Sequence, residues 1–326
     1  MIDKAIKFGK FKLGNKVTFF LSLVFLVIAI YYLSIEIESS VFIFKQHLNQ
    51  IYISEFLLSL VAVFLLQFLN WFLEALKFKI LINNFSKTSL LFVLKSIYVG
   101  NFTAFFTPER FGNFIGRAIV FKEKKEEVIM ATLIGNLSQL IITVIIGLFS
   151  MFFLKSYLFE KLLGLNSFYF LPILLYFFLL IFLLFIFFSH KSINYFLKIR
   201  VLTKWIIKFK DLNFVDISHK LSVLLFALLR YLVFYFQYLI LATALDFQID
   251  YFMLFLFVGL LFGLVTFIPS PLPGNLGTRE GLAAFLFGGG LLGIQFSFIS
   301  FLIWLINVGF STVLGGIIYS FSNLKK

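Results

Sequence analysis

The sequence predicts an all-α polytopic membrane protein with six full transmembrane helices and two re-entrant helical hairpins. Of its 326 residues, 61% are hydrophobic and only 13% are charged, and the mean hydropathy is +1.04. These values exclude a water-soluble globule. A helix of about 20 residues crosses a hydrocarbon layer of ~30 Å. Roughly eight membrane elements would use nearly the whole chain, so we expect one membrane domain (1–326) and no separate soluble catalytic domain.

Six apolar stretches are each long enough to span a membrane. The first follows a lysine-rich segment and superficially resembles a secretory signal. It is too long and lacks a small-residue cleavage site, so we interpret it as a retained helix. The six stretches are 17–35, 56–73, 128–154, 168–188, 221–245 and 297–321.

Two further regions, 88–121 and 251–292, each contain an apolar stretch, a polar Pro/Gly motif and a second short apolar segment. Each could be two half-spanning helices. Short loops rich in Lys and Arg stay on the cytoplasmic side. If 88–121 enters from the cytoplasm and returns to it, the outer loops carry only Lys45, Lys155 and Lys161. If 251–292 likewise dips in from the outer face and returns to it, Lys325, Lys326 and both termini lie in the cytoplasm.

The same arrangement predicts an inverted repeat. Residues 1–155 and 156–326 each read helix, helix, re-entrant hairpin, helix, and the two halves start on opposite sides of the membrane. Pro108 and Pro271 lie about half the chain apart. Such repeats are common in transporters, whose substrate site lies between them near the midplane. The alternative is a coincidence of segment counts, because the halves show little residue identity.

The first polar motif runs from 100 to 117 and contains Thr107, Pro108 and Gly112. Thr107 suits a helix N-cap and Pro108 suits the first helical position, so we expect a helix to begin there. Arg110, Asn113 and Arg117 would then share one helix face.

Guanidinium groups and helix amides that converge in a membrane-embedded hairpin indicate an anion site. Glu109 would balance their charge. The alternative is that Arg110 pairs with Glu109 or Glu74, and that Arg117 extends to the cytoplasmic surface.

The second motif, 268–281, interrupts any continuous helix. Its prolines remove backbone donors and its glycines permit irregular backbone, which is tolerated at membrane depth only inside protein or beside a wet cavity. Thr278 can cap a new helix that begins with Arg279 and Glu280. The residues assigned to the turn are Pro269, Pro271, Pro273, Gly274 and Gly277.

Intramembrane charges need partners. We expect Arg279 to pair with Glu109, and Glu280 with Arg110, across the two hairpins. The alternative is a purely structural salt bridge that locks the hairpins together.

Arg230 is another costly intramembrane charge, with Gln237 on the same helix face, and it is a further candidate for headgroup binding. Extension to the surface is the alternative. Asn136, Gln139 and Asn307 are explained by interhelical hydrogen bonds as well as by ligand contacts.

Metal, cofactor and nucleic-acid sites are not expected. The chain has no cysteine, and its histidines, His47, His190 and His219, lie in predicted loops without metal-ligand spacing. We interpret the net charge of +13 as encoding topology rather than nucleic-acid binding.

The two motifs, Pro108 to Arg117 and the turn that ends in Gly277 and Glu280, resemble the lysylphosphatidylglycerol synthase transmembrane (flippase-like) family. Where that family often places an acid after the glycine, this chain has Asn113. The resemblance implies a stand-alone member in a bacterial cytoplasmic membrane. We expect no aminoacyl-transferase domain beyond residue 326, so lipid synthesis is not implied.

The implied activity is movement of a polar-headgroup lipid between leaflets. Candidate lipids are a phospholipid, an aminoacylated phospholipid and a polyprenyl-phosphate-linked lipid. One alternative is a membrane transferase with Glu109 or Glu280 as general base, although no catalytic motif is found and we do not expect an enzyme. Another is a scaffold that binds a lipid-modifying enzyme through the basic loop 190–220, although attraction to anionic lipids explains that loop more simply.

Overall fold

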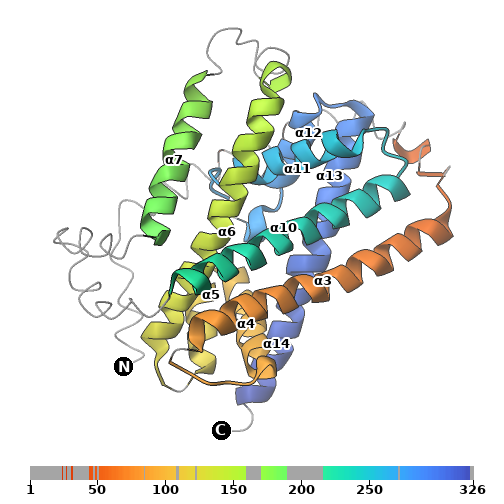
Figure 1. Cartoon of the computed structure of the whole chain (residues 1–326). Helices are drawn as coiled ribbons and strands as arrows, with labels where there is room; N and C mark the ends of the chain where they lie inside the picture. Colours follow the sequence, from red (N-terminus) through yellow and green to blue (C-terminus); the bar gives the residue numbers. More distant parts are fainter. Residues whose placement is uncertain are drawn as a thin grey trace.

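The regular elements of the computed structural model are helices throughout the part of the chain that it describes (Figure 1). The described residues are 51–83, 85–107, 110–121, 123–158, 170–188, 216–270 and 272–323, with a few positions between 24 and 49. The predicted first helix, 17–35, therefore lies almost entirely outside them. Pro108, Glu109 and Pro271 also lie outside the described residues.

Five helices of this part are long and apolar enough to cross a membrane. They confirm the all-helical, multi-pass prediction, whereas the number of full crossings stays a prediction. The five are α3 (Ile53–Ile82), α6 (Lys125–Phe153), α7 (Phe170–Phe188), α10 (Ile217–Ala244) and a final run. The final run consists of α13 (Gly290–Trp304), the π-helical turn η7 (Leu305–Gly309) and α14 (Phe310–Asn323).

Between these long helices lie two pairs of short ones. The first pair is α4 (Leu90–Phe105) and α5 (Gly112–Val120), and the second is α11 (Tyr251–Val265) and α12 (Thr278–Leu286). A 16-residue helix is only ~24 Å long, so α4 and α11 are shorter than a ~30 Å hydrocarbon layer. The 3₁₀ turn η6 (Pro273–Asn275) lies between α11 and α12.

Local side-chain caps fix where the short helices begin. Ser89 Oγ accepts the Phe92 N–H at the start of α4, and Asp250 Oδ1 accepts from Phe252 and Met253 at the start of α11. At α12, the N-cap is Gly277, whose N–H donates to Glu280 Oε2 at 2.6 Å. Thr278 was predicted to be the cap, but it is the first residue of the helix, which therefore begins one residue earlier than predicted.

The predicted start of α5 is also wrong. The helix begins at Gly112, because the chain first makes a turn in which Arg110 adopts a positive φ of 58°. Thr107 still serves this turn, since its hydroxyl accepts the Gly112 N–H at 2.6 Å.

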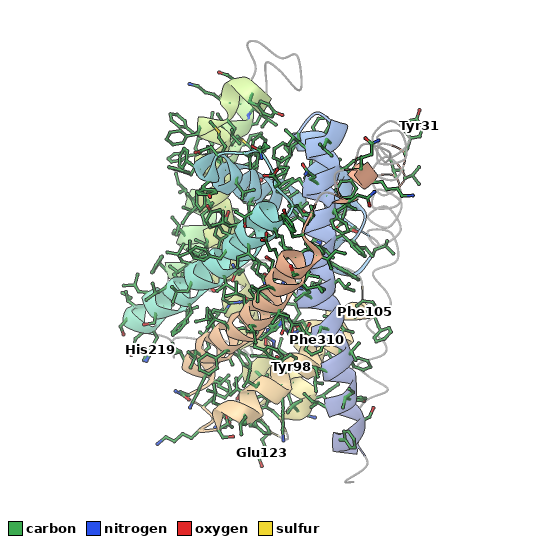
Figure 2. The ribbon with its side chains drawn as sticks, turned by 90° about the vertical axis from the view of Figure 1, so that its right-hand side faces the viewer. Tyr31, Tyr98, Phe105, Glu123, His219 and Phe310 are labelled. Atoms are coloured by element: carbon green, nitrogen blue, oxygen red, sulfur yellow. The ribbon has the colours of Figure 1, made fainter. Side chains whose placement is uncertain are left out.

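Helices that are far apart in the sequence pack against one another (Figure 1). α3 lies along α10, α4 packs against α14, and α11 packs against α6. The C-terminal end of α14 lies beside α4, at the end of the molecule opposite to α12. In Figure 2, Glu123 and His219 lie toward the α4 end, whereas Tyr31 lies toward the other.

Candidate functional site

A cavity of about 580 Å³ lies between the helix pairs and the long helices. Its wall mixes aromatic side chains with an unusual number of charged and amide groups for the interior of an apolar bundle. The charged and amide residues on the wall are Glu74, Asn101, Arg110, Asn113, Arg117, Asn136, Gln139, Arg230, Asn275, Arg279 and Asn307. Residues from both polar motifs therefore border one space.

Glu74 is the centre of the charged wall. Its side chain is 2% exposed, and it forms ion pairs with three cations. Oε1 accepts from Arg117 at 2.8 Å, and Oε2 accepts from Lys77 at 2.8 Å and from Arg230. A buried charge is tolerated only when it is paired and hydrogen-bonded, so one carboxylate stabilises three buried cations.

Helix α5 holds Arg117 in this position. Gly112 and Gly116 let α5 approach α4 so closely that a Cβ at Gly116 would lie 2.8 Å from Val99 O and 1.9 Å from Thr103 Oγ1. Asn113, one turn before Arg117, accepts from Arg117 Nε at 2.9 Å. The guanidinium also lies 4.8 Å from the centre of the Phe78 ring.

Arg230 reaches the same centre from α10. Its Nε donates to Asn70 Oδ1 at 2.8 Å, and its Nη1 donates to Glu74 and to Gln139 Oε1. The guanidinium lies 5.4 Å from the centre of the Trp71 ring. α3, α6 and α10 are thereby joined through one side chain.

The π-helical turn η7 adds an amide relay. Asn70 Nδ2 donates to Asn307 Oδ1 at 3.2 Å, Asn307 Nδ2 donates to Gln237 Oε1 at 2.9 Å, and Gln237 Nε2 donates to Val63 O. π-Bulges frequently lie at functional sites. Here the bulge places Asn307 between α3 and α10.

The second motif contributes a separate ion pair. Arg279 Nη2 donates to Glu280 Oε1 at 2.7 Å and also to Ser300 O. Glu280 Oε2 accepts the Gly277 N–H. Gly274 and Gly277 adopt φ values of 62° and 80°, a left-handed region that glycine enters without the strain of a side chain.

Arg110 differs from the other arginines of the wall. Its side chain is half-buried, and its Nη2 donates to Asn101 Oδ1 at 3.4 Å, a long hydrogen bond. None of the described carboxylates forms an ion pair with it.

The structure corrects several expected pairings. Glu280 pairs with Arg279 rather than with Arg110, and Glu74 pairs with Arg117 and Arg230 rather than with Arg110. The expected Arg279–Glu109 pair involves a residue outside the described part. Extension to the surface is wrong for Arg117 and Arg230, which are 2% and 8% exposed, because buried acceptors hold both guanidinium groups.

Asn136 and Gln139, which the sequence placed at i and i+3, both border the cavity. Gln139 also donates to Ala227 O at 3.4 Å, as expected for an interhelical hydrogen bond.

The polar face of α3 was missed by the sequence reasoning, apart from Glu74 as a possible partner for Arg110. It carries Gln67, Asn70, Glu74 and Lys77, all of which are buried. These residues recur every three or four positions, the spacing of one helix face. That spacing was the available signal, but the predicted span ended at 73, so Glu74 and Lys77 were assigned to a loop.

The family model described as Lysylphosphatidylglycerol synthase TM region matches residues 19–315. A comparison with curated proteins finds no match.

Proposed function

Because the chain belongs to the lysylphosphatidylglycerol synthase TM region family, a membrane family related to lipids, we propose that it moves a polar-headgroup lipid between the two leaflets. The headgroup would pass through the polar cavity while the acyl chains stay in the surrounding lipid. The observation that carries this proposal is the cavity of about 580 Å³, whose wall holds four arginines inside a bundle of apolar helices.

The electrostatics of the cavity favour a headgroup that contains phosphate. Arginine stays charged in proteins and binds phosphate oxygens through paired N–H donors. Arg110, Arg117, Arg230 and Arg279 come from both halves of the chain and border the same space. A headgroup in that space would exchange its hydration shell for protein donors, which lowers the cost of its passage through the hydrocarbon layer.

The arrangement of the helices supports an inverted repeat, 1–155 and 156–326, with two re-entrant hairpins. In each half a long helix precedes a pair of short helices, and a long run follows. The contacts are also exchanged between halves: α4 packs against α14, α11 packs against α6, and α3 packs against its counterpart α10. Repeats related in this way form a shared midplane site in transporters.

Catalysis is not part of the proposal. Both oxygens of Glu280, one of the candidate general bases, are engaged, one by Arg279 and the other by the Gly277 N–H. Mass spectrometry of lipids incubated with the purified protein should therefore show unchanged lipid composition. A new lipid species that is lost in the Glu280→Gln variant would instead indicate a transferase.

Leaflet exchange in vesicles tests the proposal directly. Purified protein is reconstituted with a trace of a fluorescent phospholipid, and an impermeant quencher then reports the fraction of label in the outer leaflet. We expect the quencher to reach more than half of the labelled lipid in vesicles that contain the protein, and only the outer-leaflet half of it in empty vesicles. The Lys87→Gln variant removes a charge from an exposed position and should exchange like the unchanged protein. Exchange of phosphate-containing lipids no faster than in empty vesicles would contradict the proposal.

A further inference from the structure

The described charges around the cavity do not balance. Four arginines border it, and the carboxylates bonded to them are Glu74 and Glu280. Arginine does not lose its proton in proteins, so the described carboxylates leave two positive charges unmatched even before Lys77, the third partner of Glu74, is considered. An uncompensated charge in an apolar interior is costly, and a ligand with negative charge would relieve that cost.

The excess is located on one side of the cavity. Arg279 is matched by its neighbour Glu280, whereas Arg117 and Arg230 share the single carboxylate of Glu74. Among the described side chains, Arg110 has the long hydrogen bond to Asn101 and no carboxylate partner. Both surplus charges therefore lie on the wall formed by α3, α4, α5 and α10, rather than beside α12.

The same wall holds donors without an acceptor. Arg117 Nη1 and Asn101 Nδ2 are buried and have no hydrogen-bond partner, and their residues are 2% and 3% exposed. Buried donors left without an acceptor destabilise a protein. Phosphate oxygens are acceptors of the kind that these donors lack.

The backbone of Arg110 is also strained. Its φ of 58° is uncommon for a residue other than glycine, and such strain is often found at ligand sites. The Arg110 N–H donates to Thr107 O at 3.3 Å, so the turn after α4 holds the conformation. This turn places an arginine without a described carboxylate partner at the cavity wall.

We propose that Arg110, together with Asn101 and Arg117, forms a subsite for a lipid phosphate that carries two negative charges, namely a phosphate monoester or a pyrophosphate. Two charges on the ligand match the two arginine charges that no described carboxylate balances. A zwitterionic headgroup would leave that excess in place and would bring a further cation close to the arginines. This inference rests on the proposed lipid transport and names the headgroup class that the site prefers.

Equilibrium binding tests the inference without measuring transport. The full chain in detergent is titrated with short-chain phosphatidic acid, with short-chain phosphatidylcholine and with inorganic phosphate. Binding is followed by the melting temperature and by tryptophan fluorescence, because Trp71 and Trp304 border the cavity. We expect phosphatidic acid to bind at least about tenfold more tightly than phosphatidylcholine, as the loss of a charge-assisted contact implies.

Arg110→Gln should weaken phosphatidic acid binding by about 10–100-fold. It should not lower the melting temperature of the empty protein, because it removes a cation without a described counter-ion. Arg110→Lys, which keeps the charge, should lose less affinity than Arg110→Gln. The control Lys87→Gln removes a charge from an exposed position near the same helix pair and should bind like the unchanged protein.

Three results would overturn the inference: equal affinity for the two lipids, undiminished affinity in Arg110→Gln, or inorganic phosphate binding as tightly as phosphatidic acid. The last would indicate a site for a soluble anion. Transport failure is distinguishable from these results. Selective binding without leaflet exchange would support the subsite and contradict the transport proposal. Exchange of all lipids at one rate would support transport and contradict the subsite.

Discussion

Glu74 determines the stability of the charged wall at the scale of single residues. Lys77, Arg117 and Arg230 all depend on its carboxylate, and each is at most 8% exposed. Removing one partner from a buried ion pair is strongly destabilising, because the remaining charge is left without compensation. Glu74 thus has a structural role that is separate from ligand binding by Arg110.

Glu74→Ala should lower the free energy of unfolding by about 3–5 kcal/mol, since three buried cations lose the carboxylate with which they form ion pairs. The melting temperature of the purified protein in detergent measures the effect. Glu55→Ala in the same helix is the matched control, because Glu55 is exposed, and it should melt like the unchanged protein. If both variants melt alike, Glu74 does not stabilise the cations as described.

At the scale of elements, the close crossing of α4 and α5 decides where Arg117 and Asn113 lie. A Cβ at Gly112 would lie 2.1 Å from Thr103 O, and one at Gly116 would lie 2.8 Å from Gly100 Cα. Both contacts are to backbone atoms, which cannot rotate away as a side chain can. The two helices therefore stay in contact only while these positions are glycine.

Gly116→Ala should force α5 away from α4 and destabilise the protein by about 1–3 kcal/mol, the range for overpacked interiors. Displacement of Arg117 from Glu74 should also reduce lipid exchange. Thermal melting and the vesicle assay measure the two effects.

Gly135→Ala is the control for Gly116→Ala. Its added Cβ would meet Leu81 Cδ1 at an ordinary 3.5 Å, and alanine is the better helix former. We expect it to keep both stability and exchange. Equal behaviour of the two variants would show that the crossing is not tight.

At the scale of the whole molecule, the distribution of basic residues makes an orientation testable. The loops predicted to be cytoplasmic carry most of the lysines and arginines, as the positive-inside rule requires. Glu123 and His219 lie toward the same end of the structure (Figure 2). Residues near Glu123 and His219 should therefore both lie on the cytoplasmic side of the membrane.

The chain has no cysteine, so single substitutions report location cleanly. Glu123→Cys and Ser218→Cys, at exposed positions, should resist an impermeant thiol reagent in intact cells, whereas the exposed Gln248→Cys should react. After membrane disruption all three should react. Labelling of Glu123→Cys in intact cells would contradict the proposed re-entrant hairpin 88–121, because a full crossing there would place residue 123 outside.

The sequence predicts those parts of the site that depend on neighbouring residues, and it fails where an interaction joins residues far apart in the chain. Thr107 was predicted to be the N-cap of a helix that begins at 108, but the N-cap of α5 is Phe111. The Thr107 hydroxyl instead accepts the Gly112 N–H across the turn at Arg110, and this turn depends on contacts with α4. The helix that contains Glu74 was predicted to end too early, because hydropathy alone cannot distinguish a buried charge from a loop charge. Its burial depends on Arg230, 156 residues away.

The sequence alone determined the membrane class, the apolar helices and the two Pro/Gly interruptions, because hydropathy and turn preference are properties of neighbouring residues. Only the tertiary structure decided the partners of the charges. Asn70 and Asn307 are 237 positions apart in the chain, and the packing of α3 against α10 and η7 brings them within hydrogen-bond distance. Such pairings depend on helix packing, which no local pattern specifies.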